Sequence, residues 1–118
     1  MLFRSQTAWN TYGNYRNEWI ELQTKDGSLI RADGFKISNG YWKSDEVYYN
    51  NCRVKTLDVY VDGYYVQTFT IYDYKNQEQT IYFDTPQIGN KYKFVITDAY
   101  IGRKYMDCAI TELKLFGN

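Results

Sequence analysis

The chain has 118 residues with 14 basic and 14 acidic side chains, so its formal net charge is +0 and favours neither nucleic acid nor an anionic membrane as main partner. The length suits a single domain over residues 1–118, and no apolar run is long enough to insert directly into a membrane. The complete absence of His removes the commonest general base and the commonest metal ligand.

Alternation of polar and apolar residues predicts β-strands along most of the chain. Two short turns stand between them, Lys25-Asp26-Gly27 and the two-residue hairpin turn Asp62-Gly63, and Pro86 is expected in a loop. About seven short strands without a helical stretch indicate an all-β antiparallel sandwich or barrel. The last segment also permits a short helix, although its branched neighbours favour a strand. The predicted strands cover residues 18–23, 34–38, 56–61, 67–72, 79–83, 91–97 and 109–116.

Two stretches, 39–53 and 98–107, break this alternation. Loops of about 10–15 residues inside a compact domain are usually functional or disordered, and the aromatic content here argues against disorder. The 14 Tyr exceed the needs of a core, because each buried hydroxyl requires a partner. Half-exposed rings are typical of binding proteins, so the two stretches are the candidate recognition loops.

The first stretch combines rings that can pack on the C–H faces of sugars with groups that can bond to sugar hydroxyls. An alternative is that Trp42 covers the open end of the sandwich and Asn51 fixes a turn. The rings are Tyr41, Trp42, Tyr48 and Tyr49, and the polar groups are Asp45, Asn50, Asn51 and Arg53.

The second stretch mixes rings with cations, namely Tyr100, Arg103, Lys104 and Tyr105. A cation–π contact of Arg103 with a neighbouring Tyr would be a purely structural explanation. Its acidic residues, Asp98 and Asp107, are expected to cap turns or to pair with Arg53 and Lys104. A glycosidase with paired carboxylates would need a deep cleft, for which a chain this short has little material, so no enzyme is predicted.

The aromatic residues near the start of the chain divide into two groups. Trp9 and Trp19 are expected to be structural, with the Trp19 ring covering the core. Tyr12 and Tyr15 could add a third side to the recognition site.

The two cysteines, Cys52 and Cys108, do not form a metal-type or redox C-x-x-C pair, so no zinc site is predicted. Both fall at junctions between a loop and a strand, which a jelly roll would place at the same end. A disulfide between them and two separate buried thiols remain alternatives. A cysteine nucleophile has no His to activate it.

A series of motifs, in this order and spacing, resembles a known family. The series is Thr7-Ala8-Trp9, Glu18-Trp19-Ile20-Glu21-Leu22, Asn39-Gly40-Tyr41-Trp42-Lys43-Ser44, Asn51, Arg53-Val54-Lys55, Asp98-Ala99-Tyr100, Gly102, Lys104-Tyr105, Asp107, Ala109-Ile110 and Glu112. It resembles a bacterial branch of the discoidin-like, galactose-binding-like superfamily, the NADase-type glycan-binding (translocation) domain, over residues 7–116. The resemblance implies a jelly roll of about eight antiparallel strands, with glycans bound by loops at one end and no catalytic residues.

The sequence departs from the family pattern at its start and at Cys52, where the family commonly has Asn. Family members normally carry a further strand and an Asp-Gly-Asp-like loop before Thr7-Ala8-Trp9, so the chain is expected to lack its first strand. In relatives that loop holds a structural calcium together with a Glu that Glu112 matches. Because calcium takes six to eight oxygens, Glu112 alone is a poor calcium site, and no other cofactor is predicted.

The predicted function is a non-catalytic, carbohydrate-binding accessory module of a larger bacterial protein, with a glycan or a surface protein as partner. The alternative is a protein-interaction module with the same fold and no sugar binding. A pocket lined by Tyr48, Tyr49 and Arg53 would favour a glycan, and a filled, level surface would favour a partner protein. The resemblance implies an extracytoplasmic or cell-surface location. Residues 1–5 themselves do not have the pattern of a secretory signal.

Overall fold

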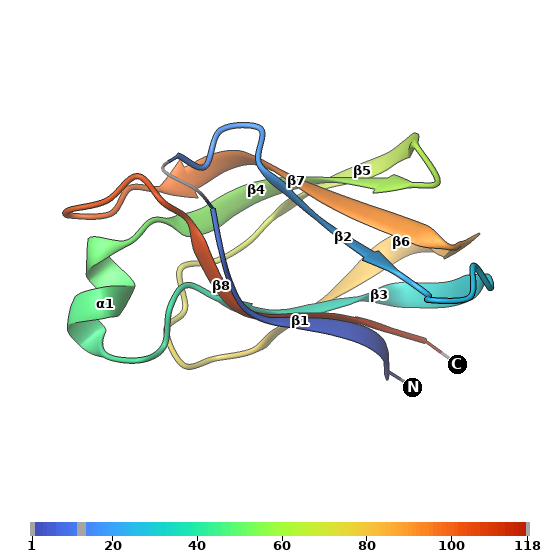
Figure 1. Cartoon of the computed structure of the whole chain (residues 1–118), viewed down its shortest axis with the longest axis horizontal. Helices are drawn as coiled ribbons and strands as arrows, with labels where there is room; N and C mark the ends of the chain where they lie inside the picture. Colours follow the sequence, from blue (N-terminus) through green and yellow to red (C-terminus); the bar gives the residue numbers. More distant parts are fainter. Residues whose placement is uncertain (1, 12–13, 118) are drawn as a thin grey trace.

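Two four-stranded antiparallel sheets pack face to face in the computed structural model (Figure 1). It describes residues 2–11 and 14–117, and for residues 2–9 the backbone only. The first sheet has the order β1-β8-β3-β6 and the second β2-β7-β4-β5, so the predicted all-β antiparallel sandwich is confirmed. The elements are β1 (Leu2–Asn10), β2 (Trp19–Gln23), β3 (Ile30–Asn39), α1 (Asp45–Asn50), β4 (Arg53–Val61), β5 (Tyr64–Thr70), β6 (Gln79–Gly89), β7 (Lys91–Tyr100) and β8 (Ala109–Phe116).

The core lies between the sheets and is built by the inward-facing residues of each strand. Leu57, Val59 and Val61 of β4 are all buried, as their alternation with polar residues predicts. Phe35 of β3 stands at the centre, with its ring 5.2 Å from that of Phe69 and 5.1 Å from that of Phe94 in edge-to-face contacts. These contacts join the two sheets directly.

Two strand predictions need correction. Pro86 lies inside β6 and not in a loop, because β6 is an edge strand and its pairing with β3 is irregular between Ala32 and Gly34. A proline without an N–H is tolerated at such a position. The helical alternative for the last segment is wrong, since β8 pairs with both β1 and β3. β1 lies at an edge of its sheet, and a strand preceding it stays a prediction.

The connections at the two ends of the sandwich differ in length. We call "turn pole" the end with the 24–29 connection, the Asp62-Gly63 turn and the Asn90 turn, on the right in Figure 1. We call "loop pole" the end with segments 40–52, 71–78 and 101–108, where α1 and the β7–β8 connection lie together on the left. The two predicted recognition loops, 39–53 and 98–107, therefore lie at the same pole.

Segment 40–52 was predicted to be irregular but contains α1. Ser44 caps the helix, because its Oγ accepts a hydrogen bond from the Val47 N–H at 3.2 Å. Asp45 and Glu46 occupy the first turn, where negative charge is favoured. Six residues are too few for a helical period to appear in the sequence, so only the cap signalled this helix.

Candidate binding site at the loop pole

Backbone hydrogen bonds join the two predicted recognition loops. The carbonyl of Tyr49 accepts a bond from the N–H of Arg103 at 2.9 Å. The carbonyl of Asn50 accepts bonds from the N–H groups of Lys104 at 3.1 Å and Tyr105 at 2.9 Å. The end of α1 and the β7–β8 connection therefore form one unit.

Gly102 makes this close approach feasible. A Cβ at this position would lie 2.4 Å from the carbonyl oxygen of Asn50 and 2.6 Å from the carbonyl carbon of Asn51. Both neighbours are backbone atoms, so they cannot move aside as a side chain would. Any larger residue at position 102 would push the two loops apart.

A half-buried ion pair, in which Arg53 is buried and Asp73 is exposed, lies next to these loops. Arg53 is only 7% exposed, and its Nε and Nη2 donate to Oδ1 and Oδ2 of Asp73 at 3.0 and 2.9 Å. Its Nη1 donates to the carbonyl of Asn51 at 3.1 Å, and the Tyr48 hydroxyl donates to Asp73 Oδ1 at 2.6 Å. Arg53 was expected to contact a ligand or to pair with Asp98 or Asp107, and its partner is Asp73 instead.

We call "clamp" the cluster of Arg53, Asp73 and Tyr48, and its electrostatics indicate a structural role. Hydrogen bonds from Arg53, and then from Tyr48, hold the pKa of Asp73 below its ordinary value. Burial, and then the neighbouring Asp73, raises the pKa of Tyr48. Burial alone would lower the pKa of Arg53, but the bonds to Asp73 outweigh it and raise that pKa. Near neutral pH the pair stays ionised and Tyr48 stays protonated, so none of the three is poised for proton transfer.

Gly40 provides the room that the clamp needs. Its φ of +84° lies in the left-handed region that favours glycine. A Cβ there would lie 2.4 Å from Tyr48 Cε2 and 2.8 Å from Arg53 Cγ. Tyr48 was predicted to be a ligand-binding ring, but the structure buries it completely against this position.

The exposed rings at the loop pole surround the clamp. Tyr49 is 36% exposed, and its ring meets the Tyr48 ring edge-to-face at 5.0 Å. The guanidinium of Arg103 lies 5.0 Å from the centre of the Tyr49 ring, so the cation–π contact expected for Arg103 is present. Tyr105 is 52% exposed beside them. None of the ion pairs found among the described residues involves Arg103, so its guanidinium donors have no carboxylate partner.

Segment 71–78 is a third side of the site that the sequence analysis missed. Tyr72 and Tyr74 are exposed and stack with ring centres 5.4 Å apart. The Tyr100 hydroxyl donates to the carbonyl of Ile71 at 2.8 Å, which ties this segment to β7. The aromatic Tyr-Asp-Tyr-Lys sequence at 72–75 could have indicated a third recognition segment, but its first residue was assigned to the strand predicted for 67–72. We call "aromatic rim" the exposed set Tyr49, Tyr72, Tyr74, Arg103 and Tyr105.

The comparison with known families agrees with this architecture. A family model described as the NAD glycohydrolase translocation F5/8 type C domain matches residues 3–116. The chain belongs to this family. No curated protein matches it. The F5/8 type C domain is a binding or translocation accessory module and not a catalytic domain, and a translocation-related family indicates an extracellular or secreted context. In the part of the chain that the structure describes, no helix has the length and apolar character to cross a membrane.

Three residues of the first loop that were predicted to bind a ligand make contacts within the F5/8 type C domain itself. The indole N–H of Trp42 donates to the carbonyl of Asn39 at 2.7 Å. The side-chain amide of Asn51 donates to the carbonyl of Val47 at 2.9 Å and closes the end of α1. Both contacts fit the structural alternative for these residues. Asp45 forms an ion pair with Lys75, which joins α1 to segment 71–78, while Tyr41 is exposed.

Of the acidic residues in the second loop, Asp98 uses its carboxylate for a local turn contact, and Asp107 uses its backbone carbonyl for a bond to the first loop. Asp98 Oδ1 accepts a bond from the Ala99 N–H at 2.8 Å, and the Asp107 carbonyl accepts from the Cys52 N–H at 2.8 Å. Glu112, the calcium candidate, pairs with Lys114 at 2.8 Å. Within the described residues no group of three or more His, Cys, Asp or Glu side chains could hold a metal. The prediction that Glu112 is a poor calcium site stays untested.

Of the early aromatic residues, Trp19 needs correction. It was expected to cover the core, but it is half exposed on the outer face of β2, with Lys93 Nζ 4.5 Å from its ring centre. Tyr15 is buried in the core and offers no exposed ring. Tyr12 and the side chain of Trp9 lie outside the described residues.

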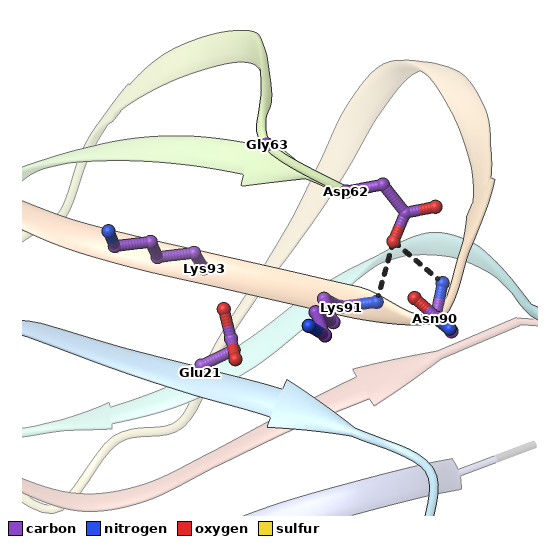
Figure 2. A pocket seen from close by; sticks show the side chains of 6 residues that line it. All are labelled: Glu21, Asp62, Gly63, Asn90, Lys91 and Lys93. Carbon is purple, nitrogen blue, oxygen red and sulfur yellow. Dashed lines mark hydrogen bonds between the residues drawn. The ribbon is translucent and has the colours of Figure 1, made fainter. Parts of the chain in front are cut away.

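Shallow hollows occur at the turn pole, away from the predicted site residues. One of about 480 Å³ is lined by Glu21, Asp62, Gly63, Asn90, Lys91 and Lys93 (Figure 2). Its Asp62 Oδ1 accepts bonds from the N–H groups of Asn90 at 3.1 Å and Lys91 at 3.0 Å. This carboxylate closes two neighbouring turns, and the hollow has no comparable exposed ring at its centre.

Proposed function

We propose that this domain is a non-catalytic module that binds a glycan on the aromatic rim, as an accessory domain of a bacterial surface or secreted protein. Exposed rings from three segments of the loop pole support this proposal. Sugar C–H faces pack on such rings, and free guanidinium donors bond to hydroxyl or carboxylate oxygens.

The observation that carries the proposal is the Tyr49–Arg103 pair. Tyr48 supports the Tyr49 ring from one side, and the Arg103 guanidinium lies 5.0 Å from its centre. The backbone bond between the same two residues, at 2.9 Å, fixes the segments that carry them. A ligand would therefore meet a ring and a cation already in place, and little conformational entropy would be lost on binding.

The clamp decides the shape of the surface. Tyr48 and Arg53 were expected to line a pocket, but both are buried and bonded to Asp73. The aromatic rim therefore offers a ligand exposed rings and not a pocket lined by Tyr48 and Arg53. Exposed rings suit one face of a chain of sugars better than they suit a single enclosed sugar.

A glycan array with matched variants tests the proposal. We expect the wild type to bind, and Tyr49→Ala and Arg103→Ala to reduce binding at least about tenfold each, as the loss of a central contact does in other interfaces. Tyr64→Ala is the control, because Tyr64 is 78% exposed at the turn pole and should leave binding unchanged. No binding by the folded wild type across a broad panel, or equal losses for Tyr64→Ala, would contradict it.

One observation favours a partner protein as the second candidate. Tyr48 and Arg53 are buried in the clamp, and backbone atoms crowd Gly102 between the two recognition loops, so these two residues do not line the pocket that would favour a glycan. Protein interfaces are enriched in Tyr and Arg, so the same rim residues would serve. A silent glycan array combined with rim-dependent binding to a secreted protein would select this function.

A further inference from the structure

Two buried cysteines lie side by side between the recognition loops. Cys52 and Cys108 have fully buried thiols and are partners in an isolated parallel β-bridge. The N–H of Cys52 donates to the carbonyl of Asp107 at 2.8 Å, and the N–H of Ala109 donates to the carbonyl of Cys52 at 3.2 Å. These two bonds fix the register that sets the cysteines opposite each other.

This register suits a covalent link. Neighbouring extended chains lie about 5 Å apart, and directly opposed residues of such a bridge direct their side chains to the same face. Disulfides join Cα atoms about 4.4–6.8 Å apart, so the bridge brings the two cysteines within range without moving the backbone. Burial, and then the nearby Cys52, raises the pKa of the Cys108 thiol, which agrees with two buried thiols close to each other.

The positions of Cys52 and Cys108 determine which segments a disulfide between them would connect. Cys52 lies between α1 and β4, and its sulfur accepts a bond from the Gly102 N–H at 3.2 Å. Cys108 directly precedes β8, and its N–H and carbonyl bond to the hydroxyl and N–H of Thr11, both at 2.8 Å. A link at this point would join both recognition loops to the end of β1.

We propose that Cys52 and Cys108 are an intrachain disulfide site that fastens the loop pole when the domain folds in an oxidising compartment. The two thiols lose two protons and two electrons and form one S–S bond. A disulfide oxidant, such as oxidised glutathione or a thiol–disulfide oxidoreductase, takes up the two electrons and becomes two thiols. Because both thiols are buried, the bond forms before the core closes, and the folded reduced protein oxidises slowly.

The test refolds the whole chain in a mixture of oxidised and reduced glutathione and, in parallel, under reducing conditions. We expect the oxidised product to be monomeric, to lose the mass of two hydrogen atoms, and to yield a Cys52–Cys108 peptide pair on non-reducing digestion. Its Tm should exceed that of the reduced protein by roughly 10 °C, as expected for a link that closes a long loop in a domain of this size.

The control is the double variant Cys52→Ala/Cys108→Ala, whose Tm should not respond to reductant. The mass and peptide measurements use the wild type alone, so they remain decisive if this variant folds poorly. Two free thiols per chain after oxidative refolding, or cross-links only between separate chains, would overturn the proposal. None of these measurements depends on the ligand of the aromatic rim.

Discussion

The chain reverses direction between strands at both poles of the sandwich, but it does so through different structures. At the turn pole, Asp62 with φ of 50° and Gly63 with φ of +86° reverse the chain in two residues. At the loop pole, longer segments are held by the half-buried Arg53–Asp73 ion pair, a capped helix and backbone bonds between loops. Hollows lie between the short turns, whereas hydrogen bonds and the ion pair join the long segments to one another. Under the proposed function, the binding site lies on the exposed rings of the loop pole, which buried neighbours hold in place, and not in the hollows of the turn pole.

The largest expected effect compares the glycines of the two poles. Gly40 and Gly63 share a positive φ, but a Cβ at position 40 would meet Tyr48 and Arg53, whereas a Cβ at position 63 would meet nothing within 4 Å. We expect Gly63→Ala to lower the free energy of unfolding by about 1 kcal/mol, from backbone strain alone. Gly40→Ala should lower it by roughly 3 kcal/mol, because overpacking of the clamp adds to the same strain.

Urea denaturation of both variants measures this difference. Equal losses for Gly40→Ala and Gly63→Ala would mean that the clamp moves aside without penalty. In that case the loop pole would be no more tightly built than the turn pole.

The next effect concerns the charge on Asp73. Replacing it with Asn leaves Arg53 buried with a neutral partner, and we expect a loss of about 2 kcal/mol at pH 7. The pKa of Asp73 is held below its ordinary value in the folded state. Its contribution is therefore complete above the unfolded pKa of about 3.9 and is lost as the pH falls through the lower folded value.

Stability measured from pH 7 down to pH 2 tests the sign of this linkage. The gap between wild type and Asp73→Asn should be constant above about pH 5 and should close in the acid range. A gap that widened on acidification would contradict the ion pair.

The smallest effect on stability should come from the rim itself. Tyr49→Ala and Tyr64→Ala both remove exposed rings, and we expect each to change the free energy of unfolding by about 1 kcal/mol or less. The two variants should differ in binding and not in stability. Thermal unfolding measured beside the binding assay checks this, and a severe loss of stability for Tyr49→Ala would assign the ring to packing.

Much of the sandwich could be predicted because its strands alternate. The segments 56–61 and 109–116 show polar and apolar residues in turn, and both form strands with their apolar side inward. Pro86 was misplaced because a β-bulge depends on the register with β3, which no local pattern encodes.

The site was harder to predict than the sheets. Adjacent residues of a helix point about 100° apart, so α1 turns Tyr48 into the core and leaves Tyr49 exposed. Without the helix the two tyrosines were equivalent in the sequence. The pairing of Arg53 with Asp73 spans 20 residues and depends on how β4 and segment 71–78 meet, so the sequence favoured nearer acidic partners.

An amide-resolved NMR titration of the labelled domain with the bound partner, whether an oligosaccharide or a peptide, locates the binding surface most directly. We expect the shifted amides to cluster at Tyr49, Arg103 and Tyr105, with Asp62, Tyr64 and Asn90 unchanged. Shifts centred on the hollows of the turn pole, with the loop pole silent, would contradict recognition by the aromatic rim.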